Sequence, residues 1–166
     1  MAEHSVIKMP LICIDASKNS MAAFEWFLEN AFKEGDTIGL VHVHVPPDLP
    51  SLGLFGRFGG GLGAMELYKE SLQESIDASK ATIAKYKDIC KNKEIKFKAF
   101  VESVDDSIGH TICKIAKENN MAFIVIGQRG LGTFRRTFFG SVSEYVLHHS
   151  HHPVIVVPLE NREEKQ

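Results

Sequence analysis

Short apolar runs alternate along the chain with longer segments in which apolar residues recur every three or four positions. Five apolar runs bounded by turn residues predict β-strands at 11–15, 37–45, 95–104, 121–127 and 153–158. Four periodic segments between them predict helices at 17–35, 65–91, 105–120 and 140–150. Because this alternation is typical of βαβ units, it predicts an α/β fold, a doubly wound five-stranded parallel sheet with helices on both faces.

The ends of the predicted helices carry signals of their own. Ser17 is a candidate N-cap of the first helix, and Gly35 is its predicted end. One face of this helix is apolar and is expected to pack on the sheet, through Met21, Phe24, Phe27, Leu28, Ala31 and Phe32. The acids at 105–106 predict that the third helix begins there, because negative charge is stabilising at the positive, N-terminal end of the helix dipole.

The 166 residues are enough for one domain with a sizeable core, and the chain shows no internal repeat. Residues 46–64 are rich in proline and glycine without a period, so they are expected to form a long mobile loop. Residues 159–166 form a charged tail. With a net charge of −2 the protein is not attracted at long range to nucleic acid or to an anionic membrane, so neither is an expected partner.

The three cysteines point to a reducing compartment. Cys13, Cys90 and Cys113 are odd in number, form no CxxC pair and lie within or beside apolar periodic segments, which suits reduced core residues. The start of the chain has no basic stretch followed by an apolar one, and no apolar run approaches the roughly 18 residues that span a bilayer. The sequence therefore predicts a cytoplasmic protein.

Candidate ligand groups fall at the carboxyl ends of three predicted strands. Asp15 follows the first strand, 41–43 end the second, and Gly127 ends the fourth. In a doubly wound sheet these ends converge on one crevice. Residues 140–143, Gly-Ser-Val-Ser, would present backbone N–H groups and two hydroxyls at a helix N-terminus, which is a way to hold phosphate without a lysine. The alternative is that the glycines of 127–140 only make a flexible strand-to-helix loop.

Two other phosphate signatures are excluded. The chain has no GxxxxGK[ST], so it is not a P-loop NTPase. A G-x-G-x-x-A occurs at Gly59, Gly61 and Ala64, but it follows an irregular segment and not a strand. Because the first strand ends in Asp15 without a glycine fingerprint, a Rossmann dinucleotide site is not expected.

The spacing Gly127-x2-Gly130-x9-Gly140-Ser141, with Asp15 and the LVHV at 40–43, resembles the nucleotide-binding signature of the universal stress protein family, in its ATP-binding subgroup. The likeness covers about residues 6 to 158. It implies a single domain with an open sheet of order 3-2-1-4-5, of the adenine nucleotide α-hydrolase-like (Rossmann-like) type. It also implies a homodimer joined along the strand at 154–158.

The resemblance further implies an ATP site, with AMP or ADP as alternatives. By position, Asp15 lies near the ribose and phosphates, and Val43 contacts adenine through its backbone. Ile126 and Gly127 line the ribose side. The phosphates are held through N–H and hydroxyl groups of Gly130, Gly140, Ser141, Val142 and Ser143. Mg²⁺ or Mn²⁺ is expected to be held by the phosphates, with no metal ligand from the protein.

The arginines of the same loop have two interpretations. Arg129, Arg135 and Arg136 either pair with the phosphates, or are solvated or paired with acids of a partner subunit. The aromatic residues Phe134, Phe138 and Phe139 are interpreted as packing residues.

The predicted function is nucleotide-dependent signalling or stress response by a cytoplasmic ATP-binding homodimer. Asp15, and less so His42, is a weak candidate general base, and no lysine draws charge from the γ-phosphate, so any ATP hydrolysis is expected to be slow. The alternative is a nucleotide-independent dimeric interaction module that recruits a partner through 46–64. The run His148, His149, His151 and His152 crosses from a helix into a strand and is not expected to bind zinc.

Overall fold

The computed structural model describes residues 9–49, 61–128 and 140–158, and the side chains of 61 and 62 are left out of the description. Within these ranges five strands form one sheet in the order β3-β2-β1-β4-β5, and every neighbouring pair is parallel. The strands are β1 (Leu11–Cys13), β2 (Thr37–His44), β3 (Lys96–Ser103), β4 (Ile124–Gly127) and β5 (Val154–Val157). The five predicted strands and the sheet order 3-2-1-4-5 are confirmed, but β1 ends at Cys13 and not at 15, and β4 begins at Ile124 and not at 121.

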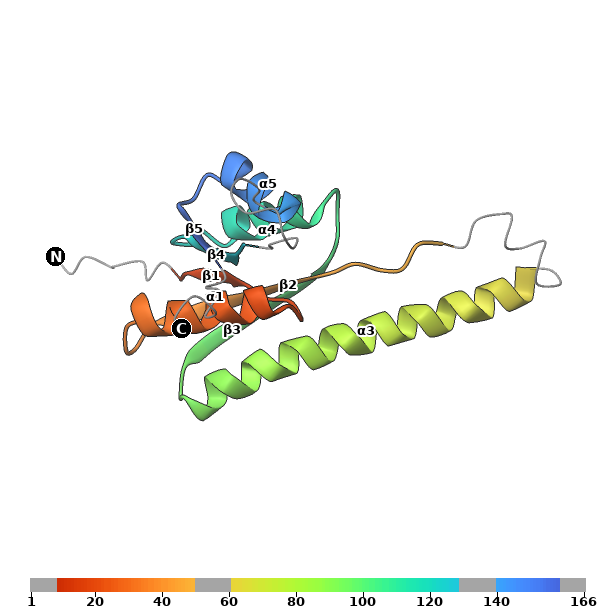
Figure 1. The fold of residues 1–166 in the computed structure, drawn as a ribbon, viewed down its shortest axis with the longest axis horizontal. Helices are drawn as coiled ribbons and strands as arrows, with labels where there is room; N and C mark the ends of the chain where they lie inside the picture. Colours follow the sequence, from red (N-terminus) through yellow and green to blue (C-terminus); the bar gives the residue numbers. More distant parts are fainter. Residues whose placement is uncertain (1–8, 50–60, 129–139, 159–166) are drawn as a thin grey trace, which may run out of the picture.

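The helices cover both faces of the sheet, so the doubly wound architecture is also confirmed. Figure 1 shows α1 and α3 on one side and α4 and α5 on the other, with the first part of α3 extending well past the sheet. Their bounds are α1 (Lys18–Asn30), α3 (Gly61–Asn92), α4 (Ile108–Glu118) and α5 (Ser141–His149). Among the described residues, no helix is both long and apolar enough to cross a membrane.

The alternation of side chains along each strand divides the core into two clusters. Ile12 and Ile14 point to the α1 and α3 side, where Phe24 and Phe27 of α1 are fully buried. Leu11 and Cys13 point to the opposite side and pack with residues of α4 and α5. The central strands β1 and β4 are buried on both faces, as continuous apolar runs in a parallel sheet require.

The first helix starts as predicted and ends earlier. Ser17 is its N-cap, and the Ser17 hydroxyl accepts from the backbone N–H of Ser20 at 3.1 Å. The helix ends at Asn30 and not at 35, because the N–H groups of Ala31 and Phe32 both bind the Phe27 carbonyl and close the last turn. Gly35 lies beyond this end, with a φ of 93° that favours glycine.

Two other helix boundaries differ from the prediction. The acids at 105–106 do not open α4, because Ser107 caps it through its side chain, which accepts from His110 N at 3.1 Å. Asp105 lies before the cap and pairs instead with Lys114 at 3.2 Å. Helix α3 begins at Gly61, so the predicted loop 46–64 ends in helix. Residues 50–60 of that loop and the tail 159–166 lie outside the described residues.

The three cysteines are unpaired thiols in the core or at its edge, as predicted. Cys13 and Cys90 are buried and Cys113 is half-buried. Burial raises the pKa of the Cys90 thiol to about 11, and it raises the pKa values of Cys13 and Cys113 as well. These thiols therefore remain protonated near neutral pH.

Candidate functional site

A cavity of about 380 Å³ opens at the carboxyl ends of β1, β2 and β4. Its walls come from the turn into α1, from Ser79 of α3, from α4 and from the start of α5. Eight of the predicted site residues line it: Asp15, Val43, Ile126, Gly127, Gly140, Ser141, Val142 and Ser143. Arg129 and Gly130, the other two predicted site residues, lie outside the described residues, as do Arg135, Arg136 and the three predicted packing phenylalanines.

The carboxylate of Asp15 is oriented by the N-cap of α1. The backbone N–H of Ser17 donates to Asp15 Oδ1 at 2.8 Å, and the Ser17 hydroxyl donates to the same oxygen. Hydrogen bonds to an ionised carboxylate are stronger than those between neutral groups, so this pair fixes the direction of the side chain at the cavity wall. The same serine thus caps the helix and holds the candidate ligand group.

At Gly127 the absence of a side chain serves close packing. A Cβ at this position would lie 2.5 Å from the backbone oxygen of Asn19 and 2.7 Å from its carbonyl carbon. The Asn19 side chain also reaches across and donates to the Gln128 carbonyl. The end of β4 and the first turn of α1 therefore touch backbone to backbone, and both line the cavity.

The N-terminus of α5 faces the cavity without a side-chain cap. Gly140 is the N-cap in an extended conformation, and no side chain of the described residues binds the first N–H groups of the helix. Ser143 does not supply such a cap, because its hydroxyl donates to the Gly140 carbonyl at 2.9 Å. Ser141 is exposed. Uncapped N–H groups at a helix N-terminus form a general anion-binding arrangement.

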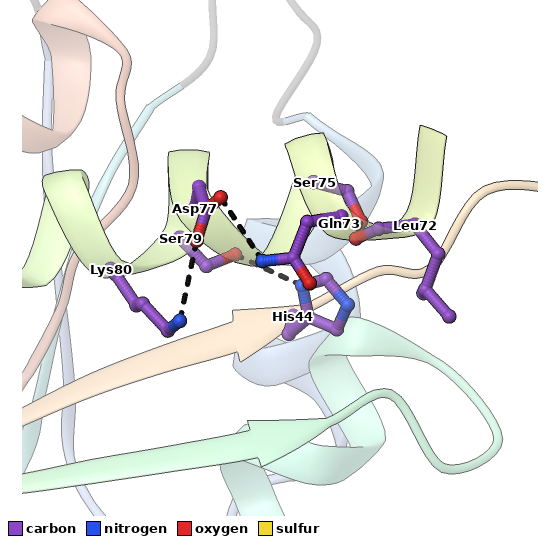
Figure 2. A network of polar contacts seen from close by, with 7 residues as sticks. All are labelled: His44, Leu72, Gln73, Ser75, Asp77, Ser79 and Lys80. Atoms are coloured by element: carbon purple, nitrogen blue, oxygen red, sulfur yellow. Dashed lines mark hydrogen bonds and ion pairs between the residues drawn. The ribbon is translucent and has the colours of Figure 1, made fainter. Parts of the chain in front are cut away.

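The two histidines of β2, His42 and His44, lie on one face of the strand, and both are hydrogen-bonded. His42 is buried, and its Nδ1 donates to the Ile14 carbonyl at 3.0 Å, which fixes the proton on Nδ1. His44 Nδ1 bonds Ser79 Oγ at 2.9 Å and so ties the end of β2 to α3; Figure 2 shows this contact between the strand and the helix. Val43 points to the other side and packs against the α4 and α5 core.

The histidine run near the C-terminus has a packing role at the end of α5. The His149 ring stacks on the Tyr145 ring with centroids 4.0 Å apart, and its Nδ1 bonds the Tyr145 carbonyl. In the part of the chain that the structure describes, no group of three or more His, Cys, Asp or Glu side chains could hold a metal ion.

The cavity combines apolar walls with a few directed polar groups. Val41, Val43 and Ile126 provide an apolar surface, while the Asp15 carboxylate, the Ser17 hydroxyl and the N-terminus of α5 supply hydrogen-bonding groups around it. A site of this kind suits a ligand with a flat apolar part and an anionic part. Sequence reasoning missed the apolar lining from Ile14, Val45 and α4, and it missed four lining residues with hydroxyl or amide side chains: Ser17, Asn19, Ser20 and Ser79.

The match to a protein family covers most of the chain. A model described as "Universal stress protein family" matches residues 10–158. The chain belongs to the universal stress protein family. Universal stress protein PHOS32 of Arabidopsis thaliana is 28% identical over 158 residues, which cover 88% of this chain and 62% of that protein. Universal stress protein Slr1101 of Synechocystis sp. is 34% identical over 94 residues, which cover 57% of this chain and 85% of the relative.

The curated relatives include longer proteins. The chain spans 62% of the length of PHOS32 and 60% of that of PHOS34, both from Arabidopsis thaliana. Similar solved structures match over nearly the whole domain. UspA of Lactobacillus plantarum has a TM-score of 0.69 at 20% identity and is covered over 97% of its length, with 91% of this chain. A family member from Arabidopsis thaliana with AMP bound has a TM-score of 0.65 at 20% identity, with 93% of each chain covered. These likenesses show the fold.

Proposed function

We propose that this protein binds ATP in the cavity at the carboxyl ends of β1, β2 and β4, and that nucleotide occupancy serves signalling or a stress response. The observation that carries the proposal is the convergence on one cavity of Asp15, Val43, Gly127 and the N-terminus of α5, which no side chain in the described part of the chain caps. These groups come from four distant parts of the chain. The family resemblance implies that each of them lies against the nucleotide.

Each part of the nucleotide has a matching part of the cavity. The apolar wall that includes Val43 and Ile126 suits adenine, with the backbone of Val43 as its hydrogen-bonding partner. Asp15 suits the ribose, and residues 140–143 suit the phosphates through N–H groups. The AMP bound to the Arabidopsis family member supports the same class of ligand.

The metal and the chemistry follow from the charges at the site. Among the described lining residues, Asp15 is the only Asp, Glu, Lys or Arg. The protein therefore offers a metal ion one carboxylate, and Mg²⁺ or Mn²⁺ would be held chiefly by the phosphates. No lysine or arginine of the described lining draws charge from a γ-phosphate, so hydrolysis is expected to be slow.

The test is mass analysis of the nucleotide released when freshly purified protein is denatured, followed by titration of the emptied protein with ATP, ADP and AMP. We expect ATP from the wild type and none from Gly140→Val, because a side chain at 140 blocks approach to the N–H groups of α5. Empty protein in both cases, with no rise in melting temperature on adding ATP, would refute nucleotide binding.

We propose in addition that two copies pair along β5. The Pro153 carbonyl accepts from Ile124 N of β4 and the Val157 carbonyl from Gln128 N just after it, so by alternation Val154 and Val156 present their backbone groups to the outer edge of the sheet. An apolar edge of this kind invites pairing with another strand. Val156→Pro removes an outward N–H without touching the β4 ladder, and light scattering should show a monomer where the wild type is a dimer. A wild-type monomer would contradict the pairing.

An interaction module that does not depend on nucleotide is the second candidate. Val45 is 51% exposed and Leu49 is 70% exposed, so the described start of segment 46–64 and the residue before it offer apolar side chains to solvent. Capture of a partner that responds to deletion of 50–60 and not to ATP would favour this function over the first.

A further inference from the structure

The chain leaving β1 is held by side chains from three different elements. Three successive carbonyls each accept one hydrogen bond: Cys13 O from Ser20 Oγ of α1 at 3.2 Å, Ile14 O from His42 Nδ1 of β2 at 3.0 Å, and Asp15 O from Tyr86 Oη of α3 at 3.1 Å. The parallel pairing of β1 ends at Cys13, and buried backbone groups beyond a sheet need other partners. Side chains supply them here.

Ser20 and Tyr86 hold both backbone groups of Asp15. Ser20 Oγ accepts from the Asp15 N–H at 2.9 Å, while the Tyr86 hydroxyl donates to the Asp15 carbonyl. The two hydroxyl oxygens also lie 3.0 Å apart. Because each hydroxyl has one proton, a hydrogen bond between them forms only when one of them turns away from its carbonyl. Both side chains are buried, at 6% and 1% exposure, so water does not compete for these bonds.

The Tyr86 ring is itself fixed by packing. It lies edge-on to the ring of Phe24, with centroids 5.2 Å apart and an interplanar angle of 85°. The hydroxyl therefore reaches Asp15 from a rigid position on α3. Since Ser17 holds the carboxylate and Ser20 with Tyr86 hold the backbone, the direction of the Asp15 side chain depends on all three.

We propose that Tyr86 is a positioning residue of the nucleotide site, acting through Ser20 and the backbone of Asp15. The inference rests on the proposed function, since it requires that Asp15 meet the nucleotide. Tyr86 is not among the described residues that line the cavity, so it acts on the ligand through its neighbours Asp15 and Ser20, which do line it. It also links α3, the long helix that extends past the sheet in Figure 1, to the site.

The experiment compares ATP affinity, with Mg²⁺ present, for the full chain and two variants of α3. Tyr86→Phe removes the hydroxyl and keeps the ring, and we expect it to weaken ATP binding about 5- to 10-fold, because a small misplacement of a ligand group carries a large penalty. Ile83→Val is the matched control: Ile83 is buried on the same helix, and its truncation lowers stability without removing any hydrogen bond to Asp15. The control should bind ATP as the wild type does.

A second comparison separates positioning from general weakening. In an Asp15→Asn background, adding Tyr86→Phe should change ATP affinity less than 2-fold, because the group that Tyr86 positions is already impaired. Full affinity in Tyr86→Phe, or the same loss in both backgrounds, would overturn the inference while leaving ATP binding intact. A wild type that binds no ATP would instead refute the proposed function, and the inference with it.

Discussion

Substitution of Gly127 by alanine perturbs the contact between β4 and α1 at one defined point. The new Cβ would lie 2.5 Å from Asn19 O and 2.7 Å from Asn19 C, both backbone atoms in the first turns of α1. Protein Cβ atoms do not approach other atoms this closely, so the two elements must separate by several tenths of an ångström. Backbone cannot rotate away as a side chain does, and the strain falls on the cavity wall that both elements share.

The expected cost follows from this geometry. Overpacking of a well-packed contact costs about 1–3 kcal/mol. In a chain of this size each 1 kcal/mol lowers the melting temperature by roughly 2–4 °C, so a loss of about 4–8 °C is expected for a penalty near 2 kcal/mol. Gly39→Ala is the matched control, because a Cβ there would meet side-chain atoms of Leu11 at 3.1 Å and Phe100 at 3.3 Å and the Pro10 backbone oxygen at 3.3 Å, distances that require shifts of only a few tenths of an ångström. Its melting temperature should stay within about 2 °C of wild type.

The assay is thermal and urea unfolding of both variants, followed by ATP titration. Gly127→Ala should lose stability and also bind ATP more weakly, since Asn19 and Gly127 line the same cavity. Equal melting temperatures for Gly127→Ala and Gly39→Ala would show that the contact with the Asn19 backbone does not make a side chain at 127 more destabilising than one at 39. That result would refute the prediction.

Three further predictions concern single groups. Ser17→Ala removes the α1 cap and a donor to Asp15, so urea unfolding should show a loss of about 1 kcal/mol or more; an unchanged midpoint contradicts the cap. The pKa of Cys90 is raised from 9.0 to about 11, so the unfolded state releases its proton first and stability should fall between pH 9 and 11, with a shallower fall in Cys90→Ala. Asp15→Ala should abolish any slow ATP hydrolysis in a phosphate-release assay; retained turnover excludes a catalytic role.

The architecture could be predicted because it depends on local patterns. Apolar runs and helical periods are read within one segment, and their alternation leaves few possible folds. Helix ends were predicted less well, since neighbouring residues compete for them. Ser107 is the N-cap of α4, although the acids at 105–106 were predicted to begin the helix. Ala31 is the C-cap of α1, although Gly35 was predicted to end it. A signal at one residue does not show which of several candidates forms the hydrogen bond.

The candidate site was predicted where it depends on the ends of strands and missed where it depends on distant side chains. Asp15 and Gly127 could be placed because the carboxyl ends of parallel strands converge, and residues 140–143 because their glycine and serines open the helix that follows β4. The partners of Asp15 could not, because Tyr86 is 71 residues away from it in sequence. One signal was available: Tyr86 falls on the apolar stripe of its helix, and a tyrosine hydroxyl buried in a core requires a partner.

The two described glycines of the predicted phosphate loop have different physical reasons to be glycine. Gly127 abuts backbone, so a side chain there would strain the fold itself. Gly140 is the N-cap of α5 with φ of −62° and ψ of 152°, a conformation open to any residue, so the backbone alone does not require glycine. The missing side chain at 140 leaves the helix N-terminus open to close approach by a ligand. Gly140→Ala should therefore leave the melting temperature within about 4 °C of wild type while weakening ATP binding, whereas Gly127→Ala lowers both.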